Sequence, residues 1–488
     1  MTRVLIAAAE AVPFAKTGGL GDVIGSLPKE LIRQGVDVRV IMPNYQDIPE
    51  RFKAQMVFKN HFFVQVGWRQ QYCGILEMVY EGVTFYFADN EYYFKRHGFY
   101  GYADDAERFG FFCRAVMESL DKIDFIPDII HCHDWHTGMV SVLLDAHYRD
   151  RPEYQHIKTL FTIHNLKYQG VFPKTIMHDI LSLDWKYFTP EGVEFHDAVN
   201  FLKGGLAFSD MISTVSRTYA QEIQDPYFGE EMDGFLCKRQ SKLVGIVNGI
   251  DYTIYNPATD KLIASTYNAD TLEKKVKNKT ELQARLGLPV REEVPVIAIV
   301  SRLVGPKGLD LIERMFQDLI KQAAITGKES YDLQLVVLGT GEARYENFFR
   351  YMAWQYPGKV SANIMFDEDL AHQIYAGADM FLMPSLYEPC GIGQLIAMRY
   401  GCLPIVREIG GLRDTVSSYN EETGEGNGFT FVNYNAHEML DTISWALRTF
   451  QDKERWNKIV GNAMHSDYSW QKSAMEYKEI YQKLIEQA

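Results

Sequence analysis

The chain has 488 residues, which exceeds the size of one ordinary domain core, so we expect two or three domains. Its hydrophobic content of 47% and charged content of 23% are typical of soluble globular proteins, and no apolar run is long enough to cross a membrane. The formal net charge of −14 argues against nucleic acid as a partner, since nucleic acids favour basic surfaces. An anionic ligand would therefore need lysines and arginines gathered at its site.

The six cysteines are scattered and form no Cys-x-x-Cys pair, which favours a reducing compartment and gives no metal-binding pattern. The opening apolar run, 4–9, weakly resembles a signal peptide, but Glu10 interrupts it early, and a buried first strand is the better interpretation. Because we recognise no signal or transit peptide, we expect a cytoplasmic protein, or one in a plastid-like compartment if the source is a plant.

Apolar segments of strand length alternate with helical segments along the chain. The expected strands lie at 4–9, 36–42, 129–132, 159–163, 211–215 and 244–247, and then at 296–300, 333–338, 362–366, 380–383 and 403–406. The expected helices include 310–321, 369–377, 394–401 and 436–450. This alternation predicts an α/β fold with two doubly wound domains of parallel strands. An eight-stranded barrel is the alternative, and the irregular strand spacing argues against it.

Residues 57–100 differ from the rest because they alternate apolar and polar positions and are rich in aromatic residues, including Phe63, Tyr72 and Phe85. This pattern predicts antiparallel strands or hairpins inserted into the first domain. We expect most of these aromatic side chains in the core of the insertion. The alternative is that one or two of them line a sugar-binding surface.

The glycine-containing loop 16–22 follows the first apolar run and precedes a segment with helical spacing. A strand, a glycine loop and a helix can present backbone N–H groups to a phosphate, and Lys16 adds a positive charge. The alternative is a tight turn that needs glycine for steric reasons, with a solvated Lys16 and with Asp22 capping the helix. Local chemistry leaves the two interpretations equally open.

Histidines gather at 131–136, after the apolar residues 129–130 of an expected strand, and His164 with Asn165 ends the next strand. A zinc site is disfavoured, because His131 and His133 share a strand face and no matching ligand cluster is evident elsewhere. Polar strand ends that face a ligand are the better interpretation, since ligands of open α/β sheets bind beyond the carboxyl ends of strands. A hydrogen-bonded core histidine is the alternative at each position.

The second half of the chain repeats this arrangement with charged loops. Arg302 and Lys307 follow the strand expected at 296–300, and two cations so close on one loop suit a diphosphate. Glu388 precedes a glycine-bearing helix start, where it could accept hydrogen bonds from sugar hydroxyls. Cys390 has no evident His or Asn partner, so we assign it a packing or backbone role. The Asp-x-Asp pattern at 367–369 precedes a helix, and N-capping explains it without a metal.

Taken together, these motifs resemble the bacterial glycogen synthase and plant starch synthase family. The resemblance rests on KTGGL at 16–20, HDWH at 133–136, TIHNLKYQG at 162–170, VNGID at 247–251 and EPCG at 388–391. It implies a GT-B fold, in which two Rossmann-like domains face each other across a deep cleft. The implied domains are 1–248, completed by a C-terminal helix at 468–488, and 249–467, which holds the nucleotide sugar.

The resemblance implies retaining transfer of glucose from ADP-glucose to the non-reducing 4-hydroxyl of an α-1,4-glucan such as glycogen, with release of ADP. ADP-glucose is then a substrate, and no cofactor or catalytic metal is expected. The implied partners are ADP-glucose and the glucan, without nucleic acid or membrane, and the oligomeric state is left open. The alternatives are the same fold with UDP-glucose as donor, and a catalytically silent glucan-binding relative.

The resemblance also assigns roles to individual residues. Arg302 and Lys307 would neutralise the diphosphate leaving group, with Lys16 supporting them. Glu388 would hold the C3 and C4 hydroxyls of glucose, and His164 would lie near the C6 hydroxyl. The implied catalytic residues are Lys16, His164, Arg302, Lys307 and Glu388, the donor-binding residues are Gly18, Gly19, Asp22, Asn165, Phe366, Cys390, Gly391, Ile392 and Gly393, and the acceptor or sugar site holds Tyr100 and Asp134.

Three positions depart from the family pattern. Pro306 stands where the family usually has Gln, and proline removes a backbone donor. Ile396 stands where many GT-B enzymes have a second Glu, so the ribose must be held otherwise. Phe366 replaces a frequent Tyr, which keeps the ring for stacking on adenine but loses the hydroxyl.

Overall fold

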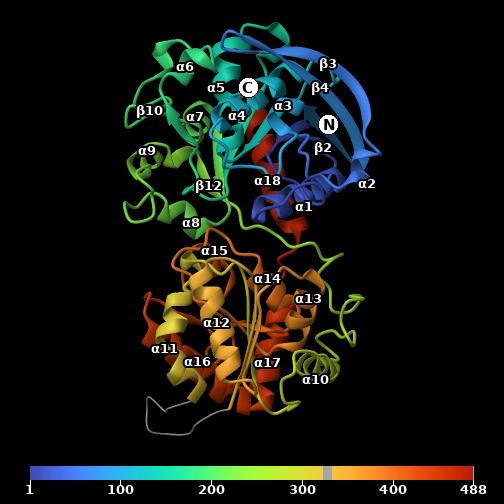
Figure 1. Cartoon of the computed structure of the whole chain (residues 1–488), viewed down its shortest axis with the longest axis vertical. Helices are drawn as coiled ribbons and strands as arrows, with labels where there is room; N and C mark the ends of the chain where they lie inside the picture. Colours follow the sequence, from blue (N-terminus) through green and yellow to red (C-terminus); the bar gives the residue numbers. More distant parts are fainter. Residues whose placement is uncertain (322–331, 487–488) are drawn as a thin grey trace. The chain divides into compact units, whose positions relative to one another are not determined.

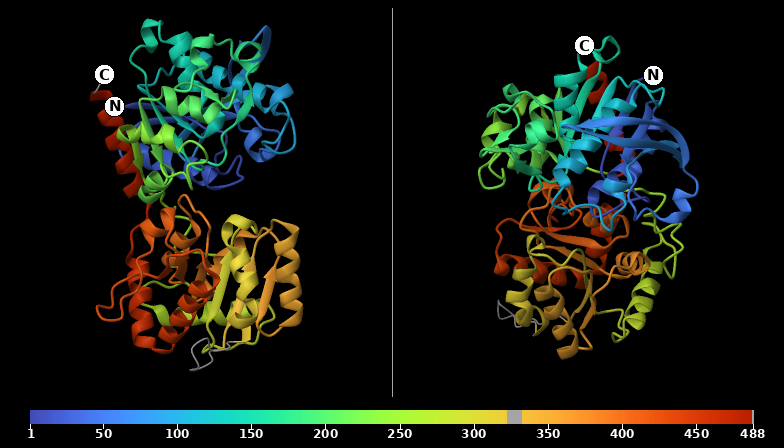
Figure 2. Two further views of the ribbon diagram at one scale, coloured as in Figure 1. Left: turned by 90° about the vertical axis from the view of Figure 1, so that its left-hand side faces the viewer. Right: turned by 45° about the horizontal axis from the view of Figure 1, so that its top comes forward.

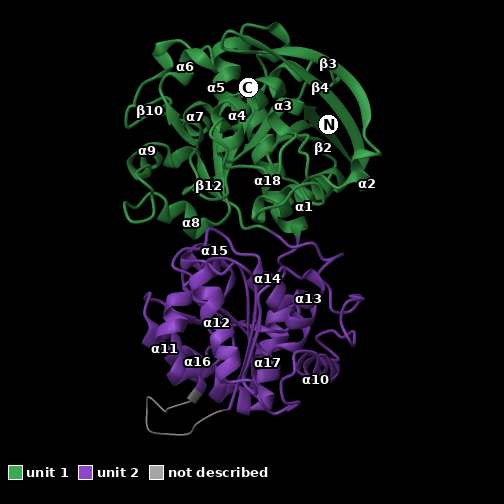
Figure 3. Cartoon of the chain, in the orientation of Figure 1, with its two compact units in different colours: residues 1–248, 470–488 green, residues 249–469 purple. Residues whose placement is uncertain are grey.

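The apolar segments assemble into parallel sheets, one in each of two units of the chain. The structure is a computed structural model, and it describes residues 1–321 and 332–486. The first unit comprises Met1–Asn248 with Trp470–Ala488, and the second comprises Gly249–Ser469 (Figure 3). Of the C-terminal helix expected at 468–488, α18 covers Trp470–Glu486, and residues 487–488 lie outside the described residues.

The sheet of unit 1 has the strand order β12-β11-β7-β6-β1-β2-β5-β4-β3. Neighbouring strands from β12 to β5 run parallel, whereas β4 pairs antiparallel with β5 and with β3. A small second sheet has the order β8-β10-β9. The strands are β1 (Arg3–Ala7), β2 (Asp37–Pro43), β3 (Val57–Val66), β4 (Arg69–Tyr80), β5 (Val83–Asp89), β6 (Ile129–His133), β7 (Lys158–Ile163), β8 (Val171–Pro173), β9 (Glu194–Phe195), β10 (Ala198–Asn200), β11 (Met211–Thr214) and β12 (Leu243–Gly245).

The helices of unit 1 cover this sheet, and the chain's last helix is among them. They are α1 (Gly19–Arg33), α2 (Glu50–Lys53), α3 (Glu91–Phe94), α4 (Asp105–Ser119), α5 (Met139–Leu143), α6 (Ile176–Asp179), α7 (Phe201–Phe208), α8 (Arg217–Glu222), α9 (Asp233–Cys237) and α18 (Trp470–Glu486). Helix α18 packs against α1, and Figures 1 and 2 show the two side by side. Two hydrogen bonds tie it to the end of α1: Lys478 Nζ donates to the Gln34 carbonyl at 2.7 Å, and Gln34 Nε2 donates to the Gln471 carbonyl at 2.9 Å.

The sheet of unit 2 has the order β15-β14-β13-β16-β17-β18, with parallel neighbours throughout. Figure 1 shows α11 and α16 on one side of it and α10 and α13 on the other. Its strands are β13 (Val296–Val300), β14 (Gln334–Leu338), β15 (Val360–Asn363), β16 (Met380–Met383), β17 (Leu403–Arg407) and β18 (Phe429–Phe431). Its helices are α10 (Lys275–Arg285), α11 (Leu309–Lys321), α12 (Ala343–Gln355), α13 (Glu368–Gly377), α14 (Gly393–Arg399), α15 (Gly410–Thr415), α16 (Ala436–Gln451) and α17 (Lys453–His465).

Both sheets reverse their strand order at a central strand, which is the property of a doubly wound fold. The reversal lies between β1 and β6 in unit 1 and between β13 and β16 in unit 2. Ligands of such folds bind at the carboxyl ends of the strands beside this point. The expected α/β class with doubly wound sheets is confirmed, and the topology points to the loops after these four strands.

One expected strand is displaced. The strand predicted at 362–366 is β15, which ends at Asn363, because its ladder with β14 pairs Leu335–Leu338 with residues 360–363. The apolar run 364–366 was misleading, since Met365 and Phe366 are exposed in the loop that follows. Asp367 then caps α13 by accepting the Leu370 N–H at 2.9 Å, which confirms the N-cap interpretation of the Asp-x-Asp pattern.

The aromatic segment 57–100 forms the antiparallel part of the main sheet of unit 1, so the predicted hairpin strands are confirmed. They extend the sheet edge and do not form a separate insertion. The prediction that its aromatic side chains are mostly core is correct for β5 and α3, where Phe85, Phe87 and Phe94 are buried. It is wrong for the outer hairpin, where Phe63 and Tyr72 are exposed, because one face of β3 and β4 is left uncovered.

Candidate active site

The loop after β1 is held in place by one buried carboxylate. Glu10 accepts the Thr17 N–H and the Thr17 hydroxyl, each at 2.6 Å, and the Gly18 N–H at 3.3 Å. It also accepts the Tyr100 hydroxyl at 2.8 Å. Because Glu10 is 3% exposed, these donors replace the water that its charge would otherwise require. The loop is therefore anchored by Glu10, while the partly exposed Lys16 side chain remains accessible to a ligand.

Lys16 and Asp22 form an ion pair at the start of α1. Lys16 Nζ lies 2.7 Å from Asp22 Oδ1, and both side chains are about one-third exposed. The helix begins at Gly19 with Gly18 as its N-cap, so the interpretation of Asp22 as the capping residue is wrong. Asp22 lies in the first turn instead, where a carboxylate favours the helix dipole. The pair sets the position of the Lys16 ammonium beside the first N–H groups of α1.

A row of histidines comprises the buried His131 and His133 of β6 and the half-buried His164 after β7. His131 and His133 lie on one face of β6, with ring centroids 4.0 Å apart. His131 Nδ1 lies 2.8 Å from the Tyr481 hydroxyl of α18, and its Nε2 lies 2.6 Å from the Thr162 hydroxyl. His133 Nδ1 lies 2.9 Å from His164 Nε2. The C-terminal helix is thus connected to His164 through His131 and His133 of β6, which contact each other through their rings.

These histidines are neutral in the folded unit. Burial holds the pKa of His131 and of His133 well below the usual range, and burial lowers the pKa of His164 to about 3. A neutral imidazole carries one donor and one acceptor nitrogen, so the His133–His164 contact requires one ring to donate and the other to accept. His164 can therefore offer a hydrogen bond to a sugar hydroxyl without carrying charge.

Asp134 joins the two strand ends. Its N–H donates to the Thr162 carbonyl at 3.0 Å, and its Oδ1 accepts the His164 N–H at 2.8 Å. Its backbone φ is +56°, in a region that a non-glycine residue adopts only when neighbouring contacts enforce it. Desolvation raises the pKa of Asp134 to about 7, against two backbone hydrogen bonds that lower it. This carboxyl group therefore titrates near neutral pH, which is a property of functional carboxyls.

Tyr100 and His136 stack above the Glu10 anchor. Their ring centroids lie 4.3 Å apart, and Tyr100 is connected to the first loop through Glu10. His136 is 6% exposed, and burial lowers its pKa to about 3. Tyr100 therefore belongs to the network that anchors the first loop, whereas Asp134 and His164 are bonded to each other.

In unit 2, the central feature is a short ion pair between the loops after β13 and β16. Lys307 Nζ lies 2.6 Å from Glu388 Oε2, which also accepts the Ser385 hydroxyl at 3.0 Å. Glu388 is 7% exposed, whereas the Lys307 side chain is 22% exposed. The two loops thus place a cation and a carboxylate at the switch point of the sheet. Both groups can form new hydrogen bonds with a ligand that arrives there.

Arg302 lies on the same loop as Lys307 and is exposed. Within residues 1–321 and 332–486, its guanidinium forms no ion pair, so its charge is available to an anion. Gly308 ends the turn η7 (Gly305–Lys307) at φ +72°, and a Cβ there would lie 1.9 Å from the Pro384 carbonyl oxygen. Only glycine allows the two loops to approach so closely. Pro306 lies inside η7, where its fixed φ suits the turn.

The EPCG loop is packed against the glycine loop after β17. A Cβ at Gly410 would lie 2.0 Å from the Glu388 carbonyl oxygen, and the Gly411 N–H donates to that oxygen at 3.2 Å. The buried Gln394 side chain donates to the Cys390 carbonyl at 3.1 Å. Cys390 is itself buried. Ile392 is the N-cap residue of α14, and Gly393 is its first residue.

Two donor-binding candidates lie away from these contacts. Phe366 is 80% exposed in the loop between β15 and α13, so its ring faces are accessible. Asn165 follows His164, and its Oδ1 accepts the Lys167 N–H at 3.1 Å. Each lies after the carboxyl end of a strand of its own unit, β15 for Phe366 and β7 for Asn165.

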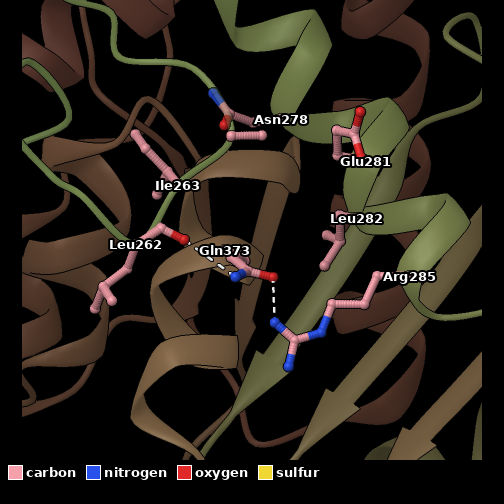
Figure 4. A pocket seen from close by; sticks show the side chains of 8 residues that line it. Leu262, Ile263, Asn278, Glu281, Leu282, Arg285 and Gln373 are labelled. Atoms are coloured by element: carbon pink, nitrogen blue, oxygen red, sulfur yellow. Dashed lines mark hydrogen bonds between the residues drawn. The ribbon is translucent and has the colours of Figure 1, made fainter.

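The described residues contain no group of three or more His, Cys, Asp or Glu side chains that could hold a metal ion. No helix among them is long and apolar enough to span a membrane. A pocket of about 220 Å³ lies elsewhere in unit 2, where Figure 4 shows Arg285 and Gln373 pointing toward each other with a hydrogen bond of 2.5 Å. None of the predicted site residues lines this pocket, whose lining is Leu262, Ile263, Ala264, Asn278, Glu281, Leu282, Arg285 and Gln373.

The chain matches two family descriptions, one for each unit. Residues 3–238 match "Starch synthase catalytic domain", and residues 280–461 match "Glycosyl transferases group 1". Together with the two doubly wound sheets, these matches define a glycosyltransferase of the GT-B fold.

The chain is similar over its full length to curated bacterial proteins. It is 55% identical to "Glycogen synthase" of Desulforamulus reducens, with 99% of each chain covered, and 53% identical to "Glycogen synthase" of Bacillus cereus, with 99% of this chain and 100% of the relative covered. Among solved structures, the catalytic domain of starch synthase IV from Arabidopsis thaliana, bound to ADP and acarbose, matches with a TM-score of 0.89 and 33% identity over 99% of each chain. The chain belongs to the family of bacterial glycogen synthases and starch synthases, as its sequence motifs predicted.

Two contributors to the site were missed from the sequence. Glu10 was noted only because it interrupts an apolar run, although an acidic residue at the carboxyl end of a buried strand is itself a signal of a polar site. Tyr481 could not be recognised, because 350 residues separate it from His131 and no local pattern connects them.

Proposed function

We propose that the chain is an α-1,4-glucan synthase that transfers glucose from ADP-glucose to the non-reducing 4-hydroxyl of a glucan, with retention of configuration and release of ADP. The observation that carries the proposal is the Lys307–Glu388 pair, 2.6 Å apart at the switch point of unit 2, with the exposed Arg302 on the same loop. A cation for the diphosphate and a carboxylate for the sugar hydroxyls are the two groups that binding a sugar nucleotide needs. Similarity to bacterial glycogen synthases supports the reaction.

In this proposal, charge neutralisation drives the departure of ADP. Arg302 and Lys307 bind the diphosphate and stabilise the negative charge that develops as the bond between the glucose C1 and the phosphate oxygen breaks. Glu388 exchanges its contact with Lys307 for hydrogen bonds to the C3 and C4 hydroxyls. The acceptor 4-hydroxyl attacks C1 from the face that the phosphate leaves, and its proton passes to the departing phosphate oxygen. Attack on that face accounts for retention.

Unit 1 supplies neutral hydrogen bonds and one further cation. Lys16, at the start of α1, supports the phosphates together with the Gly18 and Gly19 backbone and Asp22. His164, which its low pKa keeps uncharged, donates a hydrogen bond to the sugar near the C6 hydroxyl. Tyr100 and Asp134 shape the acceptor site. The hydrogen bond of Tyr100 to Glu10 and that of Asp134 to the His164 N–H hold the two residues in place and support this assignment.

ADP-glucose is preferred as donor over UDP-glucose in the proposal. The starch synthase structure with bound ADP supports an adenine nucleotide. The exposed Phe366 ring supports a stacking role on the base, together with the amides of residues 390–393, Asn165 and the loop glycines as further donor contacts. No cofactor is required, since glucose arrives already activated. Free cysteines and the bacterial relatives support a cytoplasmic location.

Incorporation of label from ADP-[¹⁴C]glucose into glycogen tests this proposal. We expect incorporation that depends on acceptor, and release of the label as glucose or maltose by enzymes specific for α-1,4 linkages. Proton NMR of a short-oligosaccharide product reports the configuration of the new bond. No incorporation with either ADP-glucose or UDP-glucose would favour a catalytically silent glucan-binding protein, and a β-linked product would exclude retention.

A further inference from the structure

A buried ion pair lies at the start of α4, in the segment that follows Tyr100. Arg108 Nη1 lies 2.6 Å from Asp105 Oδ1, and the Arg108 side chain is fully buried. Neither residue has a part in the proposed reaction. Because arginine is almost never fully buried unless its partners hold it, the contacts of this pair indicate what it does.

Arg108 holds the backbone that precedes Tyr100. Its Nη1 also donates to the Phe99 carbonyl at 3.0 Å, and its Nε donates to the Tyr93 carbonyl at 2.8 Å. The guanidinium can form these bonds together with the ion pair because its donors point in fixed, separate directions. The bonds connect α4 with α3 and with the residue directly before Tyr100.

Asp105 holds the backbone that follows Tyr100. Its Oδ2 accepts the Gly101 N–H at 2.8 Å and the Tyr102 N–H at 3.2 Å. Gly101 has φ +93°, a conformation that residues with a side chain rarely adopt, so the chain turns directly after Tyr100. The two members of the ion pair thus hold the chain on both sides of Tyr100. We call Asp105 and Arg108 the Tyr100 clamp.

Tyr100 connects the clamp to the first loop. Its hydroxyl donates to Glu10 Oε1 at 2.8 Å, and the same oxygen accepts the Thr17 hydroxyl at 2.6 Å. Glu10 Oε2 accepts the N–H groups of Thr17 and Gly18. A path of direct contacts within unit 1 therefore leads from α4 to the loop that carries Lys16.

The clamp is a costly way to fill this part of the core. Arg108 Nη2 is buried without a hydrogen-bond partner among the described residues, and Arg108 Cζ lies 4.8 Å from the Tyr102 ring centroid and 5.4 Å from that of Phe109. Removing a charged pair and a free donor from water has a cost that apolar side chains of similar size avoid. Packing alone does not require these residues, whereas their directed hydrogen bonds suit a positioning task.

We propose that Asp105 and Arg108 are positioning residues for glucose transfer, which act through Tyr100 and Glu10 on the loop of Lys16. The inference rests on the proposed function for the roles of Tyr100 at the acceptor and of Lys16 at the phosphates. One path of contacts serves both roles, so a displaced Tyr100 weakens acceptor binding and charge stabilisation together. The clamp residues are buried and are not catalytic themselves.

Arg108→Lys in the full-length chain is the first test. Lysine keeps a charge beside Asp105, but its donors share one nitrogen and cannot reproduce the three contacts of the guanidinium. With the preferred donor and glycogen, we expect kcat to fall about tenfold and the KM for glycogen to rise about threefold, while the donor KM stays within about twofold. Asp105→Asn should change the same parameters in the same direction. Thermal unfolding checks that each variant is folded at the assay temperature.

A double-mutant cycle separates positioning from general destabilisation. Tyr100→Phe removes the hydroxyl that contacts Glu10, so Arg108→Lys added to this variant should lower kcat by no more than about twofold. Losses that add in full would overturn the proposal. So would a kcat within about twofold of wild type for both Arg108→Lys and Asp105→Asn.

A second buried arginine of α4 provides the matched control. Arg114 is 8% exposed and donates to the Leu181 carbonyl at 2.6 Å, a bond that joins α4 to the segment after α6. Arg114→Lys also replaces a buried guanidinium, and it should leave kcat within about twofold of wild type. Equal losses of kcat in Arg114→Lys and Arg108→Lys would overturn the proposal.

Amide hydrogen exchange, measured by mass spectrometry, tests the path of contacts without turnover. In Arg108→Lys we expect exchange about tenfold faster at 101–102, whose N–H groups donate to the clamp, and also at 17–18, at the far end of the path. Arg114→Lys should change neither segment. Faster exchange at 101–102 with unchanged exchange at 17–18 would show that the clamp does not act on the first loop.

The two proposals fail in distinguishable ways. If wild type transferred glucose from neither donor but the exchange pattern held, only the proposed function would fall, and the clamp would still position the first loop. If wild type transferred glucose normally and the losses in the cycle were additive, only the positioning role would fall.

Discussion

The candidate site residues of unit 1 are mostly uncharged, whereas the polar ones of unit 2 are charged. Apart from the Lys16–Asp22 ion pair, the site of unit 1 keeps histidines neutral by burial, as at His131 and His133, and encloses the Glu10 carboxylate with hydrogen-bond donors. In unit 2, charges are retained in a short ion pair, Lys307–Glu388, next to the exposed Arg302. A row of neutral hydrogen bonds fixes geometry, whereas charges on loops supply electrostatic stabilisation.

This difference indicates which part of the substrate each unit is suited to bind. A departing diphosphate needs cations that are already in place, and unit 2 has them at the carboxyl end of its sheet. A sugar with many hydroxyls needs oriented donors and acceptors, and unit 1 provides them in its neutral histidines and in the Asp134 carboxyl group. The comparison also predicts that the two units respond differently to pH and to substitution.

The largest expected effect is acid destabilisation of unit 1. His131, His133, His136 and His164 have pKa values lowered by burial, so below about pH 6.5 the unfolded chain binds protons there that the folded unit does not. The free energy of unfolding therefore decreases as the pH falls. Asp134, with its pKa raised to about 7, acts in the opposite direction, because the folded unit takes up its proton first. Because the four histidines outnumber this one carboxyl group, the net effect is a loss of stability of unit 1 as the pH falls below about 6.5.

Pulse proteolysis at pH 7.5 and pH 5, with the fragments identified by mass spectrometry, measures this difference. We expect cleavage within 1–248 to increase at pH 5 before cleavage within 249–469. In unit 2, the buried His372 lies 2.7 Å from the Asp260 carboxylate, so its environment differs from that of the histidine row. Unit 2 opening first, or both opening together, would contradict the comparison.

The next largest effect is expected for Lys307→Ala. The substitution removes a cation from the diphosphate position and leaves the Glu388 carboxylate, 7% exposed, without its ion-pair partner. We expect a loss of about 3 kcal/mol in transition-state stabilisation, or roughly 100-fold or more in kcat. Steady-state kinetics with a saturating donor measures it. Lys359→Ala, which breaks a partly exposed ion pair with Asp332, is the control. A kcat within a few-fold of wild type for Lys307→Ala would contradict the role that we assign to Lys307.

A smaller effect is expected for Glu10→Ala. The variant leaves the Thr17 and Gly18 N–H groups and the Tyr100 hydroxyl without their acceptor, so the first loop loses its anchor. We expect kcat/KM to fall by about 30-fold, or about 2 kcal/mol, and Glu10→Gln to fall between this variant and wild type. Glu81→Ala breaks an exposed pair with Lys29 in the same unit and should stay within about twofold. Unchanged kinetics in Glu10→Ala would show that the loop needs no anchor.

The smallest effect is expected for Tyr481→Phe. Loss of the hydroxyl at 2.8 Å from His131 Nδ1 removes one hydrogen bond at the far end of the histidine row. We expect a loss of about 1 kcal/mol, or roughly fivefold in kcat, with little change in the donor KM, because the residue positions His164 through two rings. Met475→Ala, at an exposed position of the same helix, is the control. A change in KM alone would assign Tyr481 a different role.

Much of the fold could be predicted because its signals are local. Buried parallel strands are short apolar runs, so β13 and β16 begin and end at the residues expected from the sequence. The prediction failed at Phe366, because the apolar segment continues past the end of β15 into a loop where this side chain is exposed. The short strand β18 and the small sheet of β8, β9 and β10 were missed, since strands this short carry too few residues for a pattern.

The site could be predicted where charged residues directly follow a strand, as Arg302 and Lys307 do. The assigned roles of these residues stay predictions. Contacts that depend on distant packing could not be foreseen, and the Tyr481–His131 contact is one of them. The antiparallel strands that carry Phe63 and Tyr72 were predicted, but the exposure of these two side chains was not. The alternation of apolar and polar residues does not show which face of a hairpin is covered.

The most direct test of the central claim is a comparison of donors with glycogen as acceptor. Initial rates with ADP-glucose and UDP-glucose over a range of concentrations give kcat/KM for each. We predict a higher kcat/KM for ADP-glucose, with ADP released in equal amount to the glucose incorporated. A higher kcat/KM for UDP-glucose would contradict the account.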